Sequence, residues 1–344
     1  MALNDLLKLT MINGTSGRED DVRAYILNEL NTMDLPADAV RTDRLGNILV
    51  HKKGAKAPEK RLLLTAHMDE VALMITYIYD DGSLAFDCVG GVLAAAVIGR
   101  TVTVNGHPGV IGSKPIHHLS KEEREKPASM HALTIDIGAA DKAEALRYVR
   151  PGDIAYFDTA WRRFGEDSLA AKALDDRFGC AVLLHLLRSD LPYDTEFAFL
   201  VQEEVGLRGA LPAANAVDPD VALIFEATTA ADLPDSAGAD RVCELGKGAV
   251  ISFIDGRTVY DKGLYDLAVS VCCEQNIPWQ TKTKIAGGND AGAIQNAGHG
   301  VRVLAISVPC RYLHSPVSVI REQDAQACAA LAAAMIPAVQ ERLT

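Results

Sequence analysis

The alternation of apolar and polar residues divides the chain into three stretches. In residues 4–30 the apolar side chains recur at helical spacing around a glycine-containing break, which predicts two helices joined by a turn. Residues 47–51 and 61–66 have the pattern of strands, and the second is apolar enough to lie in a sheet covered on both faces. After residue 169 long helices alternate with solid apolar strands. The predicted helices there are 176–187, 262–275 and 323–342, and the predicted strands are 196–201, 221–225 and 303–308.

The stretch between these parts has a different texture. In residues 71–165, short alternating segments are interrupted by Gly and Pro every ~8–12 residues, which is typical of a small all-β module. We therefore predict an α/β fold, a doubly wound mixed sheet flanked by helices, built from residues 1–70 and 166–344. Residues 71–165 are predicted to form an inserted, β-barrel-like domain.

Composition restricts the classes of partner. The formal net charge is −12, so a nucleic-acid backbone would be repelled. The sequence has no basic and apolar leader, and its apolar runs fall short of the about 20 residues that cross a bilayer, so we expect no membrane partner. The seven cysteines are scattered without a C-x-x-C pair, which predicts neither a disulfide framework nor a zinc knuckle and fits a cytoplasmic protein.

Residues of metal-ligand type follow the predicted strands directly. In an open α/β sheet, ligands bind in the crevice beyond the carboxyl ends of the strands, so such residues would meet at one edge. They are His67 after strand 61–66, Glu203 and Glu204 after 196–201, Glu226 after 221–225 and His314 after 303–308, with Asp175 ahead of helix 176–187. Each alone would pass as a surface or capping residue, but their convergence predicts a metal centre.

These residue types suit a pair of divalent ions. Imidazole and carboxylate together bind zinc, cobalt or manganese, and two such ions about 3.5–4 Å apart form a recurrent hydrolytic centre. We expect Asp175 to bridge two ions in each subunit. His67 and Glu226 would complete one site, and Glu204 and His314 the other. Zinc is the first choice, with cobalt and manganese as alternatives.

Two further acids have predicted catalytic roles. Glu203 lies beside Glu204, and because neighbouring side chains diverge at a strand end, one can bind metal while the other stays free as a general base. Asp69 follows His67 in an H-x-D pair, where it would accept the second ring N–H and orient the imidazole. The predicted reaction is attack of metal-activated water on an amide carbonyl, after which Glu203 passes the proton to the leaving amine.

Other polar residues have simpler explanations. Asp176 and Asp290 each begin a predicted helix, so capping explains them, with a substrate contact as the less favoured alternative. His117 and His118 fall in a predicted surface loop of the inserted module, and His185, inside a helix, is expected to be structural. The sequence contains no G-x-S-x-G elbow, H-E-x-x-H motif, Walker loop or dinucleotide fingerprint, which argues against those catalytic classes.

These motifs resemble those of the tetrahedral (TET-type) or glutamyl aminopeptidases, dinuclear-metal enzymes that include proteins once labelled cellulases. The matching segments include SGREDDVR, DRLGNILV, TAHMDEV, IGSKPIHHLS, KALDDRFGC, QEEVGLRGA, GGNDAGAIQ and RYLHSP. The resemblance implies a zinc-peptidase type of α/β domain, a β-rich dimerisation module, assembly into dimers and a dodecamer, and the ligands and base named above. Glu226 stands where many relatives carry Asp, which lengthens the arm by one methylene, and Ser318 stands where an acid is common.

The predicted function is removal of N-terminal residues from peptides by a cytoplasmic, self-associating metalloaminopeptidase. One alternative is a metal-dependent deacylase of N-acyl amino acids or small amides, because the same ions can cleave any amide that fits. A metal-independent glycosidase using Glu203 and another carboxylate, or a catalytically silent shell protein, is less favoured. The sequence leaves the preferred substrate side chain open.

Overall fold

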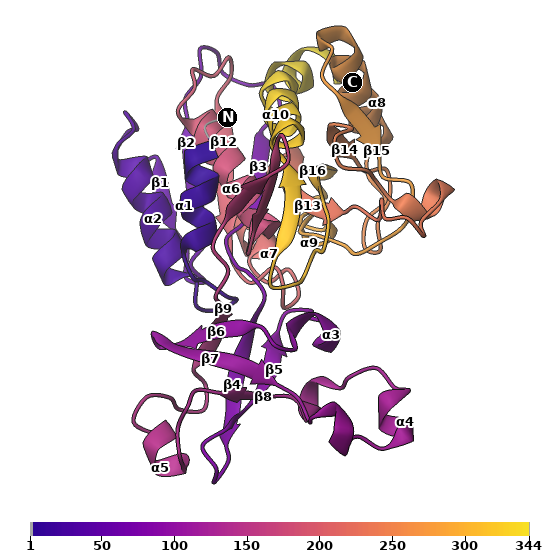
Figure 1. Cartoon of the computed structure of the whole chain (residues 1–344). Helices are drawn as coiled ribbons and strands as arrows, with labels where there is room; N and C mark the ends of the chain where they lie inside the picture. Colours follow the sequence, from indigo (N-terminus) through magenta and orange to yellow (C-terminus); the bar gives the residue numbers. More distant parts are fainter. Residues whose placement is uncertain (1–2, 344) are drawn as a thin grey trace. The chain divides into compact units, whose positions relative to one another are not determined.

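The computed structural model describes residues 3–343, the side chains of residues 116 and 123 excepted (Figure 1). The chain divides into two compact units, which are described separately. The first comprises residues 1–70, 161–313 and 318–344, and the second comprises residues 71–160 and 314–317. The predicted α/β class with a doubly wound mixed sheet is confirmed. Within the described residues, no helix has the length and apolar character needed to cross a membrane.

Within residues 3–343, the first unit contains an eight-stranded sheet in the order β1-β2-β12-β3-β13-β16-β14-β15. The four strands β12, β3, β13 and β16 are parallel to their neighbours in this group and form its centre. The strands are β1 (Val40–Thr42), β2 (Ile48–Lys52), β12 (Thr195–Leu200), β3 (Leu62–His67), β13 (Val221–Thr229), β16 (Arg302–Cys310), β14 (Ala249–Ile251) and β15 (Trp279–Thr281). His67 is the last residue of β3, Glu203 and Glu204 follow β12, and Glu226 lies within β13, which extends beyond its predicted end to Thr229. Since parallel strands share one carboxyl edge, these predicted ligands are brought towards that edge.

Helices bury the apolar surface of this sheet. α6 packs on β3 and β13 and also contacts α1 and α10, while α7 packs on β12 and against α9. Every residue of β3 is buried, as expected for a strand covered on both faces. The helices are α1 (Leu3–Met11), α2 (Asp20–Asn31), α6 (Leu174–Leu187), α7 (Ala210–Val217), α8 (Lys262–Gln275), α9 (Ala291–Ile294) and α10 (Glu322–Arg342), with a short 3-10 turn η3 (Gly238–Arg241).

Some elements have too weak a pattern to be predicted. β10 (Arg162–Phe164), β11 (Ser168–Ala171) and β17 (Ser318–Arg321) form a separate three-stranded sheet. β14 and β15 have only three residues each, too few for periodicity to be recognised.

The second unit is a closed barrel in the order β4-β5-β8-β7-β6-β9. Its core contains buried Leu73, Val102, Ile111 and Ile135. The predicted surface position of His117 and His118 is confirmed, because both are exposed. The elements are β4 (Ala72–Ile78), β5 (Leu84–Val89), α3 (Ala94–Val97), β6 (Thr101–Val104), β7 (His107–Gly112), η1 (Ile116–His118), α4 (Lys121–Arg124), η2 (Met130–Ala132), β8 (Thr134–Asp136), α5 (Lys142–Ala145) and β9 (Ile154–Phe157).

A fully buried arginine on α6 connects the N-terminal helices to the segment after β3. Arg177 donates from Nε to the carbonyl of Met68 (2.8 Å) and from its terminal nitrogens to the carbonyls of Leu9 (2.6 Å), Ile12 (2.8 Å) and Gly14 (3.2 Å). The guanidinium is therefore satisfied mainly by main-chain oxygens. Met68 lies directly after His67, so this arginine also holds the main chain next to a predicted metal ligand.

Candidate metal centre

His67 ends β3 with its imidazole almost completely buried. Its Nδ1 lies 3.1 Å from the main-chain carbonyl of Asp69 and 3.4 Å from that residue's carboxylate. Because Nδ1 faces the oxygens of Asp69, it can carry the ring proton when Nε2 binds a cation. Nε2 points to Asp175 Oδ1 at 3.5 Å and Glu226 Oε2 at 3.7 Å. The imidazole therefore presents its ligand nitrogen to two of the predicted ligand carboxylates.

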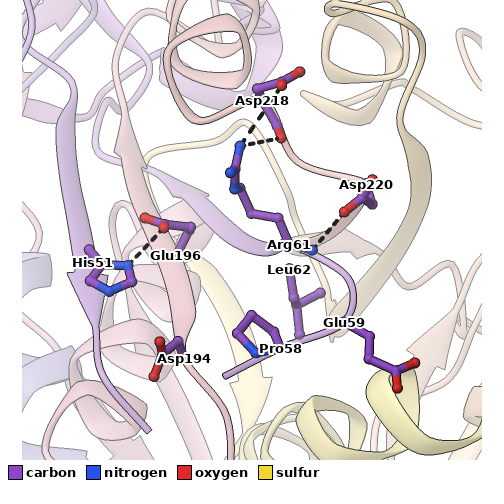
Figure 2. Close-up of a pocket in the computed structure, with 9 residues that line it drawn as sticks. All are labelled: His51, Pro58, Glu59, Arg61, Leu62, Asp194, Glu196, Asp218 and Asp220. Carbon is purple, nitrogen blue, oxygen red and sulfur yellow. Dashed lines mark hydrogen bonds and ion pairs between the residues drawn. The ribbon is translucent and has the colours of Figure 1, made fainter. Parts of the chain in front are cut away.

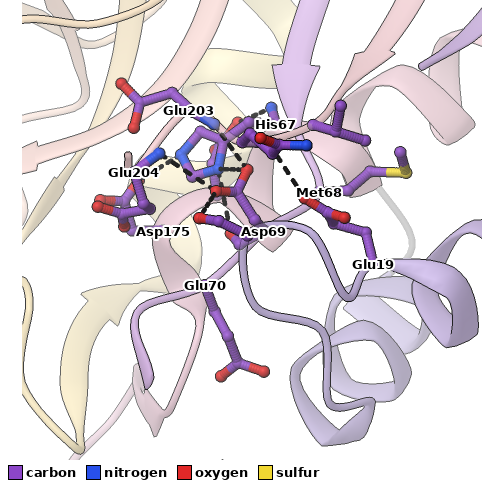
Figure 3. A network of polar contacts seen from close by, with 12 residues as sticks. Glu19, His67, Met68, Asp69, Glu70, Asp175, Glu203 and Glu204 are labelled. Carbon is purple, nitrogen blue, oxygen red and sulfur yellow. Dashed lines mark hydrogen bonds and ion pairs between the residues drawn. The ribbon is translucent and has the colours of Figure 1, made fainter. Parts of the chain in front are cut away.

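Asp69 is buried below this imidazole and organises the neighbouring turn (Figure 3). Its carboxylate accepts hydrogen bonds from the main-chain N–H of Glu203 (3.0 Å) and Glu204 (3.1 Å), and from the hydroxyl of Ser16 (2.6 Å). Burial would raise the pKa of Asp69, but His67 and these donors outweigh it and the pKa is lowered. Asp69 thus stays ionised and holds both the imidazole and the acidic doublet.

Glu203 and Glu204 lie in a turn that follows β12. The strand ends at Leu200, and Gln202 adopts a left-handed φ of 57° that redirects the chain. One ligand-type atom from each of His67, Glu203 and Glu204 can be chosen so that all lie within 4.8 Å of one another. The acidic doublet is therefore brought to the imidazole, while Glu70, which follows Asp69, points away from the ring in Figure 3.

Asp175 and Glu226 complete the buried part of the cluster. Atoms of His67, Asp175 and Glu226 also lie within 4.8 Å of one another. The peptide bond between Asp175 and Asp176 is cis. Asp176 caps the regular part of α6 by accepting the N–H of Gly179 at 2.9 Å, and it also accepts the N–H of His67 at 3.2 Å. The predicted capping role of Asp176 is thus confirmed.

The electrostatics of the cluster favour a bound cation. Burial raises the pKa of Glu203 and of Glu226 well above the ordinary value, and neighbouring carboxylates raise both further. The pKa of His67 is also raised, because surrounding carboxylates outweigh the burial that would lower it. Within residues 3–343, Glu226 Oε1 is buried without a hydrogen-bond partner. Excess buried negative charge with an unsatisfied oxygen fits a divalent ion held by carboxylate and imidazole.

His314 lies in the turn between β16 and β17. Arg311 and Val319 exchange main-chain hydrogen bonds of 3.0 and 2.9 Å across the base of this turn, and Arg311 forms a two-bonded ion pair with Asp232 at 2.6 and 2.7 Å. His314 itself is exposed, has a left-handed φ of 55°, and belongs to the second unit. Its role as a metal ligand stays a prediction.

Asp290 differs from its predicted role. It precedes α9 but makes no capping hydrogen bond with its side chain, so the predicted cap is wrong. The N–H of Ala291 is instead accepted by the side chain of Asn289 at 2.9 Å. Capping patterns in the sequence cannot distinguish two adjacent residues that can both cap, and this ambiguity hid the buried carboxylate of Asp290.

A hollow of about 510 Å³ lies at the opposite, amino edge of the parallel strands (Figure 2). Most of its charged groups pair with each other or with the main chain. His51 Nδ1 lies 2.8 Å from Glu196, and Asp220 accepts the N–H of Arg61 at 2.7 Å. The candidate site therefore remains the carboxyl edge.

Comparison with known proteins agrees with this geometry. The profile of the M42 glutamyl aminopeptidase family matches residues 46–331. The chain belongs to the M42 glutamyl aminopeptidase family. A putative aminopeptidase of Acetivibrio thermocellus is 38% identical over 323 residues, covering 93% of this chain and 94% of the relative. The predicted resemblance is thereby confirmed.

Solved structures with this fold include an aminopeptidase and a peptidase. The aminopeptidase of the archaeon Desulfurococcus kamchatkensis has a TM-score of 0.91 at 35% identity, with 97% of this chain and 94% of that chain covered. The Pyrococcus horikoshii TET1 peptidase, which can assemble into a tetrahedron or a large octahedral shell, has a TM-score of 0.84 at 34% identity, with coverage of 97% and 98%.

Membership of the M42 family decides the enzyme class. The chain is a metal-dependent aminopeptidase, as predicted, and the family implies divalent metal ions. The deacylase alternative is not favoured by any of these similarities.

Proposed function

We propose that this M42 enzyme removes N-terminal residues from peptides with two divalent ions per subunit. Asp175 would be shared between the ions, His67 and Glu226 would bind one, and Glu204 and His314 would bind the other. The observation that carries the proposal is the group of buried His67 and Glu226 with partly buried Asp175, whose ligand atoms lie within 4.8 Å of one another.

The protein residues have distinct tasks in this proposal. Bound divalent ions lower the pKa of water and polarise a carbonyl, so they supply the nucleophile and the electrophilic assistance. Glu203 is the general base: it accepts a proton from the attacking water and donates it to the leaving amine. Asp69 is a positioning residue. Its main-chain carbonyl orients the imidazole of His67 through Nδ1, and its carboxylate accepts the main-chain N–H of Glu203. Zinc suits this mixture of ligands, with cobalt and manganese as alternatives.

Chelation tests this proposal directly. The purified protein is dialysed against a chelator, reconstituted with zinc, cobalt or manganese, and assayed on a panel of aminoacyl anilides. We expect activity to disappear on chelation and return with metal, and metal analysis to find two ions per chain. Hydrolysis that is indifferent to the chelator would contradict the proposal.

A substitution separates the base from the ligands. Glu203→Gln keeps the size of the side chain but cannot accept the proton, so turnover should fall by about 10²–10⁴-fold while two ions stay bound. Glu226→Gln is the comparison, because it replaces a proposed ligand and should lose one ion. A Glu203→Gln variant that loses metal instead would make Glu203 a ligand and overturn the assignment of roles.

We propose further that the chain self-associates into dimers and a dodecamer, with residues 71–165 as the dimerisation domain and residues 1–70 and 166–344 as the catalytic domain. The assembly of the TET1 peptidase into closed shells supports this proposal. Light scattering coupled to gel filtration would measure the mass in solution. A monomer at every concentration and metal content would refute it.

A further inference from the structure

Asp290 carries a buried charge that the proposed ligand set and base leave without a task. The residue is only 1% exposed, and within residues 3–343 neither of its carboxylate oxygens has a hydrogen-bond partner. Leaving a buried carboxylate unsatisfied is costly, and such groups in folded proteins usually have a ligand or a functional partner. Burial raises the pKa of the Asp290 carboxyl to about 7, so its ionised form is held at a cost that a cationic ligand would relieve.

The turn that carries Asp290 is held firmly by its neighbours. Asn289 caps α9 with its side-chain oxygen and donates from its amide nitrogen to the hydroxyl of Tyr260 at 3.0 Å. Tyr260 in turn donates to Asp255 at 2.5 Å, and Asp255 accepts the N–H groups of Arg257 and Thr258. The position of Asp290 thus does not depend on hydrogen bonds of its own carboxylate.

Asp290 lies within electrostatic reach of the catalytic residues. Its charge contributes to the raised pKa of Glu203, and His67 and Asp69 act on its own carboxyl. α9, which it precedes, packs on β13 and β16, and β13 carries Glu226.

The ligand that satisfies such a group must be cationic and must donate hydrogen bonds. The amino end of a peptide is a compact ammonium with three N–H donors, and a carboxylate is its natural acceptor. An acceptor beside the general base would also place the first peptide bond, rather than a later one, at the reacting atoms.

We propose that Asp290 is the acceptor for the α-ammonium group of the peptide substrate, and so restricts cleavage to the first residue. This inference rests on the proposed aminopeptidase function. It assigns to Asp290 a binding task separate from metal binding and from proton transfer by Glu203.

The test compares two substrates that differ only in the amine: L-leucine p-nitroanilide and its des-amino analogue, 4-methylpentanoyl p-nitroanilide. Asp290→Asn should lower kcat/KM for the amine substrate on the order of 30- to 100-fold, mainly through KM, as expected for the loss of a charged hydrogen bond. The rate on the des-amino analogue should stay within about 3-fold, since the group that Asp290 recognises is absent. Asp266→Asn, an exposed carboxylate on α8 paired with Lys262, is the matched control and should change neither rate.

Binding gives a readout without turnover. Calorimetry with L-leucinol and with 4-methylpentanol, which lacks the amine, should show that the wild-type enzyme prefers the amine and that Asp290→Asn loses this preference. If Asp290→Asn does not fold, Asp290→Ser replaces it. A crystal of the wild-type enzyme with L-leucinol should place the ammonium nitrogen within hydrogen-bond distance of Asp290.

The outcomes separate the two proposals. Equal losses on both substrates would mean that Asp290 positions Glu203, and a lost metal ion would make it a ligand; either overturns the inference while the aminopeptidase function stands. A nitrogen bound elsewhere in the crystal also overturns it. If instead the wild-type enzyme cleaves neither substrate, or cleaves them without metal, the proposed function itself fails.

Discussion

Replacing Arg177 with lysine should destabilise the protein far more than a conservative change of one charged residue normally does. Arg177 is fully buried and reaches four main-chain carbonyls, those of Leu9, Ile12, Gly14 and Met68. Lysine keeps the charge but presents its three donors from one nitrogen, so it cannot reproduce the spread of the planar guanidinium. We expect it to leave about two of these buried carbonyls without a donor.

The magnitude follows from those two groups. An orphaned buried acceptor costs about 1–3 kcal/mol, so Arg177→Lys should lower the free energy of unfolding by about 2–6 kcal/mol. That is a large share of the about 5–15 kcal/mol that stabilises a typical folded protein. The activity should fall as well, because the carbonyl of Met68 lies between His67 and Asp69 in the chain.

The assay is urea unfolding followed by circular dichroism, at one fixed protein concentration. Arg342→Lys is the matched control, because Arg342 pairs with Glu274 on the exposed surface and its replacement should not measurably change the midpoint. The slope of unfolding free energy against urea should be the same in both variants. Equal midpoints for Arg177→Lys and Arg342→Lys would refute the reasoning.

Three further substitutions test other parts of the structure. Ser16→Ala removes the 2.6 Å hydrogen bond to Asp69 and should lower kcat roughly 5- to 20-fold with metal content unchanged; lost metal would contradict this. Gly179→Ala would place a Cβ 2.4 Å from Asp176 Oδ2 and 2.8 Å from the Cβ of Ala66, so urea unfolding should show a loss of about 1–3 kcal/mol. Burial raises the pKa of Asp324 to about 6. The contribution of this group to stability is therefore greatest below its unfolded pKa and is lost as the pH rises through the folded value. The stability of the wild type relative to Asp324→Asn should fall between about pH 4.5 and 6.5, and a rise would refute this.

The central sheet could be predicted from the sequence because its strands bury both faces. β3, β13 and β16 each contain a run of buried apolar residues, and such runs are distinctive in any sequence. The ligand-type residues could be predicted for a related reason: in a parallel sheet, a polar residue directly after a buried strand has one edge to occupy. This is why His67 and Glu226, which are 159 positions apart by number, could be placed together.

Long-range polar contacts could not be predicted in the same way. Glu70 and Lys172 form a buried ion pair with a 2.7 Å contact, yet each has the sequence pattern of a surface charge because burial of a charged residue leaves no periodic signal. Asp290 shows the same limit, since its position before a helix suggested a cap and its burial depends on packing between distant segments. The short strands β10, β11 and β17 depend on pairing partners rather than on local pattern.

The dispersal of the proposed ligand residues along the chain has a consequence for biosynthesis. His67 lies in the first quarter of the sequence, Asp175 near its middle, and Glu226 later still, with the whole barrel of residues 71–160 encoded between the first two. A nascent chain emerging from the ribosome therefore exposes an early histidine long before the acids that share its edge have been translated. With these residues as the ligands, metal capture would be a late event in the making of this enzyme, and truncated translation products would lack a complete binding centre.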